Sequence, residues 1–166
     1  MSLSSLVHGG DLILPAGEGY VNIRVGAIIL RGGQFLMAGN SGTDYLYSVG
    51  GRVKLGESTE DAVVREVLEE TGVRMEIDRL GFVHEAFFAG DNGKTLGKVI
   101  YELAFYYYMK VPEVFEPVCE SCAYDGKREF LEWVSFDSDR KYFPEFFRSE
   151  LCAPSREVKH FITREI

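Results

Sequence analysis

The sequence predicts a single α+β domain in which one helix packs against a mixed β-sheet. Runs of β-branched and aromatic residues, each the length of a strand, are separated by turns rich in glycine, asparagine and aspartate. One stretch, residues 59–71, instead has the apolar spacing of an amphipathic helix. A chain of 166 residues with 46% hydrophobic residues can build its own core, so we expect one domain over residues 1–166.

The expected strands follow one another after a weakly patterned segment at residues 1–19. The first strong strand, residues 20–30, is rich in β-branched residues, and the glycine pair Gly32 and Gly33 returns the chain in a hairpin. Residues 99–111 form the longest run, and their aromatics alternate only partly, so we expect both faces of that strand to be covered. The full set of expected strands comprises residues 12–14, 20–30, 35–38, 45–49, 73–77, 80–88, 99–111, 128–136 and 157–163.

The helix expected over residues 59–71 has recognisable ends. Ser58 or Glu57 can cap its first turn, which also carries acidic residues. Gly72 stands where the end of a helix favours a left-handed residue. A second, short amphipathic helix is expected to begin at Pro144.

Three acids gather in the first helix where folding alone would not place them. Glu66, Glu69 and Glu70 are three and four residues apart, so they share one side of the helix, away from Val64 and Leu68. Like charges at this spacing repel one another and lower stability. A divalent cation removes that repulsion, and carboxylate oxygens suit Mg²⁺, Mn²⁺ or Ca²⁺. The sequence therefore predicts a metal site on this helix.

Charge and hydropathy argue against several other classes of protein. The formal net charge is −8 and no run of Lys and Arg occurs, so we expect no polymeric nucleic-acid partner. An anionic substrate stays open, because a bound metal reverses the local sign of charge. No apolar run approaches the roughly 20 residues that span a bilayer, and residues 1–14 lack the features of a signal peptide. With an odd number of cysteines, Cys119, Cys122 and Cys152, we expect reduced thiols and a cytoplasmic location.

The stretch at residues 51–73 resembles the Nudix box, G-x5-E-x7-R-E-U-x-E-E-x-G-U, in which U is an aliphatic residue. The matching positions are Gly51, Glu57, Arg65, Glu66, Val67, Glu69, Glu70, Gly72 and Val73. Every specified position matches, and a match of this length is far more specific than a lone glycine motif. The resemblance, which is specific only in the box, extends over roughly residues 20–151.

The resemblance to this MutT-like hydrolase family implies an α/β/α sandwich and the hydrolysis of a nucleoside diphosphate linked to another moiety. It implies Mg²⁺ or Mn²⁺ as the cofactor, because divalent cations neutralise a pyrophosphate and lower the pKa of bound water. The implied metal-binding residues are Glu57, Glu66, Glu69 and Glu70, with the backbone at Gly51 close to the metal. Arg65, four residues before Glu69, would orient a helix glutamate through a charge-assisted hydrogen bond.

The resemblance leaves the general base and the substrate contacts open. A box glutamate, Glu69 or Glu70, is one choice of base, and a carboxylate from a later loop is another. We favour Glu129, four residues before Trp133, over Glu116 and Glu120 in the acidic loop. The candidates for substrate binding are Tyr45 and Tyr47, which can stack on a base, and Arg52.

The substrate is predicted only by elimination. The family's marks for dinucleoside polyphosphates or ADP-ribose, a Tyr or a Pro shortly after the box, are missing from residues 87–90. A nucleoside triphosphate is therefore the expected small-molecule substrate, with a nucleotide sugar as an alternative. Two further hypotheses are a non-catalytic nucleotide sensor and an isomerase acting on isoprenyl diphosphates, which would need Cys119 or Cys122 in the site. A homodimer would form through the N-terminal strand or residues 157–163.

Overall fold

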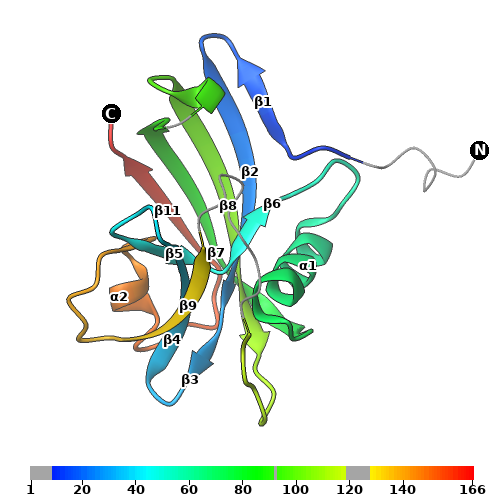
Figure 1. Cartoon of the computed structure of the whole chain (residues 1–166), viewed down its shortest axis with the longest axis vertical. Coiled ribbons are helices and arrows are strands. Elements are labelled where there is room, and N and C mark those ends of the chain that lie inside the picture. Colours follow the sequence, from blue (N-terminus) through cyan, green and yellow to red (C-terminus); the bar gives the residue numbers. More distant parts are fainter. Residues whose placement is uncertain (1–8, 92, 119–127) are drawn as a thin grey trace, which may run out of the picture.

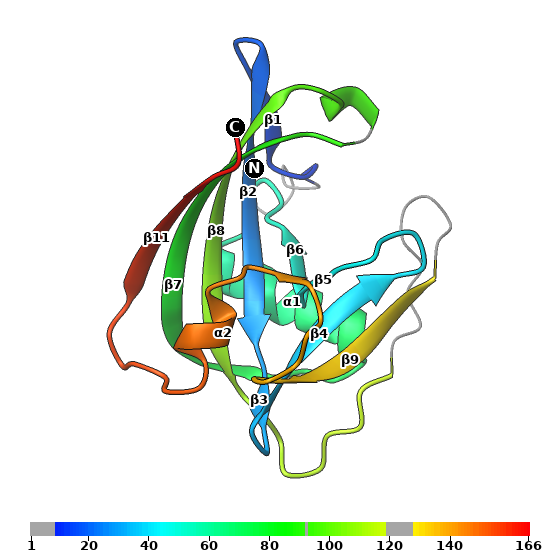
Figure 2. The ribbon, with the colours of Figure 1, turned by 90° about the vertical axis from the view of Figure 1, so that its left-hand side faces the viewer.

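The structure is a computed structural model that describes residues 9–91, 93–118 and 128–166. Within those residues the chain forms two β-sheets between two helices. Helix α1 (Thr59–Thr71) lies on one side of the sheets and the short helix α2 (Phe147–Glu150) on the other, as Figure 1 and Figure 2 show. The predicted α+β class, with mixed sheets and the acidic helix packed on them, is confirmed.

The first sheet is mixed and carries the long strands. Its order is β1 (Ile13–Ala16), β2 (Gly19–Ile28), β8 (Val99–Lys110), β7 (Glu76–Ala89) and β11 (Lys159–Arg164), with β6 (Gly50–Arg52) also pairing with β2. The pairs β2–β8 and β7–β11 are parallel, whereas β2 is antiparallel to both β1 and β6. Strand β6 therefore connects the first residues of the box directly to β2.

The second sheet is shorter and lies beside the first. Its order is β10 (Tyr142–Phe143), β5 (Leu46–Ser48), β4 (Gln34–Asn40) and β3 (Leu30–Arg31), with β9 (Glu129–Ser135) pairing with β4. The turn between β3 and β4 uses Gly32 and Gly33, both at positive φ (57° and 76°). That conformation is readily available only to glycine, so the hairpin predicted from this pair forms there.

Two apolar clusters fill the space on either side of the central strands. One, on the α1 side, includes Val25 and Tyr107, and the other, on the α2 side, includes Ile28 and Tyr106. Alternate residues of β2 and β8 point into opposite clusters, because successive side chains in a strand face opposite ways. Residues 106–109 are all buried, which confirms that both faces of this strand are covered.

The structure corrects several of the predicted elements. The strand expected at residues 20–30 is divided into β2 and β3, which belong to different sheets. Residues 73–77 and 80–88 were expected to be separate strands, but β7 runs unbroken through Asp78 and Arg79. Register irregularities next to these residues absorb the break, and Arg79 stacks its guanidinium on the ring of Tyr108, 3.9 Å from the centroid. The second helix begins at Phe147 and not at Pro144, since residues 144–146 form a turn.

The N-terminal segment is more ordered than its weak pattern suggested. Strand β1 pairs with β2 at an edge of the sheet, where Pro15 costs no ladder hydrogen bond. Before it, Leu12 donates to the carbonyl of Val53 at 2.8 Å and Leu55 donates to that of Gly10 at 3.1 Å. Residues 9–12 thus run along the loop that leads into α1. Among the described residues, no helix has the length and apolar character needed to cross a membrane.

Candidate active site

Helix α1 is held at both ends by the residues that the sequence indicated. The Ser58 hydroxyl accepts a hydrogen bond from the backbone N–H of Asp61 at 3.0 Å. Gly72 adopts a left-handed φ of 72° and donates its N–H to the carbonyl of Leu68 at 2.9 Å. These caps fix the first and last residues of α1, the helix that carries the acidic residues of the box.

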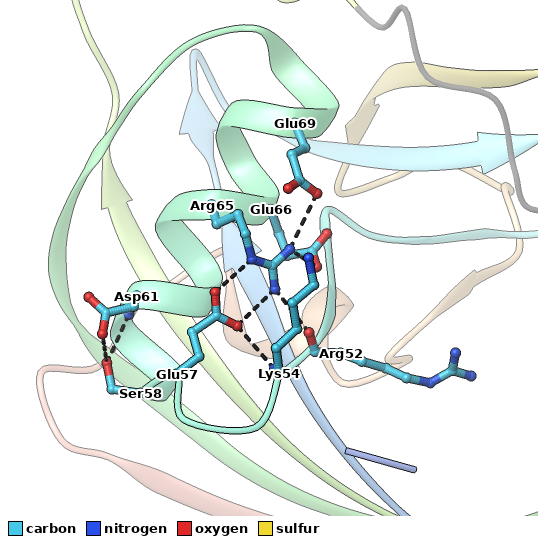
Figure 3. Close-up of polar contacts among 8 residues, drawn as sticks. All are labelled: Arg52, Lys54, Glu57, Ser58, Asp61, Arg65, Glu66 and Glu69. Atoms are coloured by element: carbon cyan, nitrogen blue, oxygen red, sulfur yellow. Dashed lines mark hydrogen bonds and ion pairs between the residues drawn. The ribbon is translucent and has the colours of Figure 1, made fainter. Parts of the chain in front are cut away.

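Arg65 is the centre of the polar contacts in the box (Figure 3). It donates two hydrogen bonds to the Glu57 carboxylate, at 2.6 and 2.9 Å, and one to Glu66 at 2.6 Å. A longer bond of 3.3 Å reaches Glu69, so the contact expected from their spacing is present. Arg65 also donates to the carbonyl oxygen of Arg52 at 3.1 Å. One guanidinium therefore fastens the loop after β6 to the exposed side of α1.

These contacts hold Glu57 in its ionised form. The hydrogen bond from Arg65 lowers the pKa of Glu57, and the backbone N–H of Lys54, 3.0 Å from its carboxylate, lowers it further. The same bond to Glu57 contributes most to raising the pKa of Arg65. The pair thus forms a charged clamp at the start of the helix.

Gly51 lets the backbone of β6 approach the helix closely. A Cβ built on this glycine would lie 2.5 Å from the carboxylate carbon of Glu66. Burial raises the pKa of Glu66, and the hydrogen bond from Arg65 opposes that rise. The backbone at Gly51 therefore lies against the Glu66 carboxylate, while its predicted place beside a metal stays a prediction.

Glu70 is the most strongly perturbed acid of the box. One carboxylate oxygen accepts a hydrogen bond from the backbone N–H of Gly50 at 3.1 Å, and the other, Oε2, is buried without a partner among the described residues. Burial raises the pKa of Glu70 to about 8; the Gly50 bond opposes the rise, and the charges of Glu66 and Glu129 add to it. A buried carboxylate oxygen without a partner marks a place for a cation or a proton.

The donor set fits a divalent cation, although the acids are not gathered around one point. Across residues 9–91, 93–118 and 128–166, no group of three His, Cys, Asp or Glu side chains is arranged to hold a metal ion. The reason is electrostatic, because Arg65 draws Glu57, Glu66 and Glu69 to itself while Glu70 turns to Gly50. The orphaned oxygen of Glu70 and the close approach at Gly51 are the features that suit a cation.

Glu129 reaches the same region from the second sheet. It begins β9 and lies opposite Asn40 in the ladder with β4. Its negative charge contributes to the raised pKa values of both Glu70 and Tyr47, where burial is the larger cause, so it lies within electrostatic range of the box. The fold thus brings a carboxylate from a distant part of the chain towards the buried end of α1.

Tyr45 and Tyr47 are half-buried at the β5 side of the site. The Tyr47 hydroxyl accepts a hydrogen bond from Asn40 Nδ2 at 3.5 Å, and the Tyr45 ring packs edge-on against Phe143 at 5.4 Å between centroids. Burial raises both pKa values, and the positive charge of Arg24 lowers them. The two tyrosines are therefore partly structural and lie within range of a cation on the first sheet.

The sequence interpretation missed that cation. Arg24 is half-buried on β2; burial lowers its pKa, but the charges of Glu102, Glu66 and Glu70, among others, outweigh burial and raise it. It therefore links the acids of the box to a polar part of the first sheet. The alternation of polar and apolar side chains along residues 22–27 is the signal that would have revealed it.

Several other candidates lie away from these contacts. Glu116, a rival for the general base, is exposed in the loop after β8. The other rival, Glu120, and the pair Cys119 and Cys122 fall outside the described residues. Cys152 is a free, exposed thiol.

Comparison with known proteins identifies the family of the chain. The family model of the NUDIX domain matches residues 21–148, from β2 to α2. The chain belongs to the Nudix family. The complete box and the family match make it a Nudix pyrophosphohydrolase by class. No curated protein matches the chain.

Solved structures share the Nudix fold at low sequence identity. The MutT protein of Bacillus halodurans is 17% identical, with a TM-score of 0.57, over 87% of this chain and 91% of that chain. An ADP-ribose pyrophosphatase of Streptococcus suis is 18% identical, with a TM-score of 0.55, over 85% of this chain and 98% of that one. A UDP-X diphosphatase is 15% identical, with a TM-score of 0.55, over 88% of this chain and 69% of its own.

Proposed function

We propose that this Nudix hydrolase cleaves a pyrophosphate bond in a nucleoside diphosphate linked to another moiety, with a nucleoside triphosphate as the substrate. The observation that carries the proposal is the buried, partly unpaired carboxylate of Glu70 beside Glu66 and the glycine pair. A folded chain keeps such an arrangement, which costs stability, where it serves a bound cation and its anionic ligand.

Mg²⁺ or Mn²⁺ is the cofactor that we assign to this site. Glu57, Glu66, Glu69 and Glu70 would hold it, with the backbone at Gly51 beside them. When bound, the cation neutralises the pyrophosphate and lowers the pKa of a water molecule. It also compensates the charge of Glu66 and Glu70, whose ionised forms burial disfavours.

The remaining roles follow from position. Arg65 orients Glu57, Glu66 and Glu69 through the hydrogen bonds described above, and therefore sets the positions of the ligand oxygens. We assign Glu129 as the general base, because it approaches the site from outside the helix and would face the water that attacks phosphorus.

Tyr45, Tyr47 and Arg52 are assigned to substrate binding. The tyrosines are half-buried and lie within electrostatic range of Arg24. The Arg52 side chain is partly exposed, and its Nε lies 3.1 Å from Asn22 Oδ1 on the first sheet. A nucleotide sugar is the second candidate substrate, because two of the structural relatives are named for the cleavage of nucleotide-linked diphosphates.

The test is a panel of nucleoside triphosphates and nucleotide sugars with Mg²⁺ or Mn²⁺, read by identifying the products. We expect one class to be hydrolysed, and we expect Glu69→Gln and Glu70→Gln to lower kcat/KM by more than about 100-fold. Glu60→Gln is the matched control, since Glu60 is an exposed acid in the first turn of the same helix. Wild-type activity in both site variants would show that these acids do not form the site. Tight nucleotide binding without turnover would favour the sensor.

A further inference from the structure

A buried hydrogen-bonded pair lies on the first sheet, away from the box. Asn22 on β2 is only 3% exposed, and its Nδ2 donates to Glu102 Oε2 on β8 at 2.7 Å. Its Oδ1 accepts from Arg52 Nε at 3.1 Å, and Arg52 in turn lies 3.6 Å from Asp11. Because both ends of the amide are engaged, its orientation is defined, and so is the Glu102 oxygen that it holds.

The second oxygen of Glu102 is left without a hydrogen bond. Within the part of the chain that the structure describes, Oε1 accepts from no donor, and Glu102 is half-buried. Oε1 is also not among the buried side-chain atoms that lack a partner, so it faces solvent and is available to accept a hydrogen bond from a ligand. Its charge also repels phosphate, so a ligand at this point presents a neutral group.

The strand register places this pair in line with the box. Gly26 of β2 lies opposite Gly50, Arg24 lies opposite Arg52, and Asn22 comes two residues further along the same strand. At about 3.3 Å per residue, Gly26 and Asn22 are roughly 13 Å apart. Arg24 lies between them, within electrostatic range of both Glu102 and the box acids. A diphosphate at the box would therefore extend its nucleoside along β2 and β8.

We propose that Glu102, held by Asn22, is a nucleoside-recognition subsite that accepts two adjacent hydrogen-bond donors of the substrate. The 2′- and 3′-hydroxyls of a ribose present such a pair, and so do the N1–H and N2–H groups of guanine. The inference rests on the proposed function, because it places the substrate's diphosphate at the box. It narrows the substrate to a ribonucleotide or a guanine nucleotide.

The network allows a test in which the direction of one hydrogen bond is reversed. In Glu102→Gln, the new amide must present its oxygen to Asn22 Nδ2 to keep that hydrogen bond. Its NH2 group then takes the place of Oε1, so a donor and not an acceptor faces the ligand. The double variant Asn22→Asp with Glu102→Gln turns this amide around, because the new carboxylate accepts from the NH2 and from Arg52. An acceptor then faces the ligand again, and the net charge equals that of the wild type.

The measurement compares GTP with ITP, which lacks the exocyclic amine, and GTP with dGTP, which lacks the 2′-hydroxyl. We expect the wild type to prefer GTP by about 10- to 100-fold in kcat/KM in one of these pairs, and that pair identifies the donors. Glu102→Gln should bring the ratio close to one, and the double variant should restore part of it. Glu85→Gln is the matched control, since Glu85 lies on the opposite face of the same sheet and pairs with His160.

Two results would overturn the subsite: no preference in either pair, or an unchanged preference in Glu102→Gln. If the wild type hydrolyses none of these nucleotides, the proposed triphosphatase activity fails. Calorimetry then measures the Kd values of GTP, ITP and dGTP for the wild type and both variants. The same changes in preference, now seen as ratios of Kd, test the subsite independently of any hydrolysis.

Discussion

The substitution Glu70→Gln tests whether the buried acid of the box is held at a cost that only a cation relieves. Glu70 accepts one hydrogen bond from Gly50, while its Oε2 is buried without a partner among the described residues. An amide has nearly the same shape as the carboxylate but does not ionise. The variant therefore removes the charge and leaves the packing of α1 in place.

The size and sign of the effect follow from the pKa. The value of about 8 in the folded chain lies above the ordinary 4.5, so between these pH values the unfolded chain loses a proton that the folded chain keeps. The contribution of Glu70 to stability is therefore full below pH 4.5 and is lost as pH rises towards 8. Between about pH 5 and about pH 7.5 the metal-free wild type should lose about 3 kcal/mol that the variant does not lose.

The assay is urea unfolding of both proteins in a metal chelator at these two pH values. For each protein we compare the free energy of unfolding at the two pH values. A cost of packing the amide that does not depend on pH cancels in this difference. Adding Mg²⁺ at the higher pH should stabilise the wild type and have little effect on the variant, because a ligand that binds only the folded state shifts unfolding. The reasoning would be refuted if the two proteins lost the same free energy between these pH values.

Three further predictions concern the glycine contact, the helix cap and a buried histidine. In Gly51→Ala the new Cβ would lie 2.5 Å from the Glu66 carboxylate and displace it. The affinity for Mg²⁺, measured by titration, should therefore fall by about 10- to 100-fold. An unchanged affinity would contradict a role for this contact in metal binding. Ser58→Ala removes the helix cap and should cost about 1 kcal/mol in urea unfolding without changing kcat/KM; a loss of activity at full stability would argue for a role beyond capping. Burial, with a smaller contribution from His160, lowers the pKa of His84 to about 4 from 6.5, so its contribution to stability is present above pH 6.5 and lost as pH falls towards 4. In His84→Gln that loss should shrink by about 3 kcal/mol, and identical acid profiles would contradict it.

The box could be read from the sequence because its signals are local. The spacing of Glu66, Glu69 and Glu70 places them on one side of a helix whatever the helix packs against. Capping by Ser58 and termination at Gly72 likewise depend on residues a few positions apart. Local geometry of this kind survives in any fold that keeps the helix.

The breaks between strands were harder to predict for the opposite reason. Asp78 and Arg79 were expected to separate two strands, yet β7 passes through them because the long partner β8 and the ring of Tyr108 hold the strand. Neighbouring strands decide such cases, and a single sequence does not reveal them.

By itself the sequence determined the helix, its caps, the set of box residues and, through them, the family. Only the tertiary structure decided what surrounds the acids. Arg65 draws in three of them, Glu70 is buried against Gly50, and Glu129 arrives from another sheet. It also brought Asn22 and Glu102 together from 80 positions apart. The physical reason is that strand pairing sets which distant side chains meet, and burial then sets their charges.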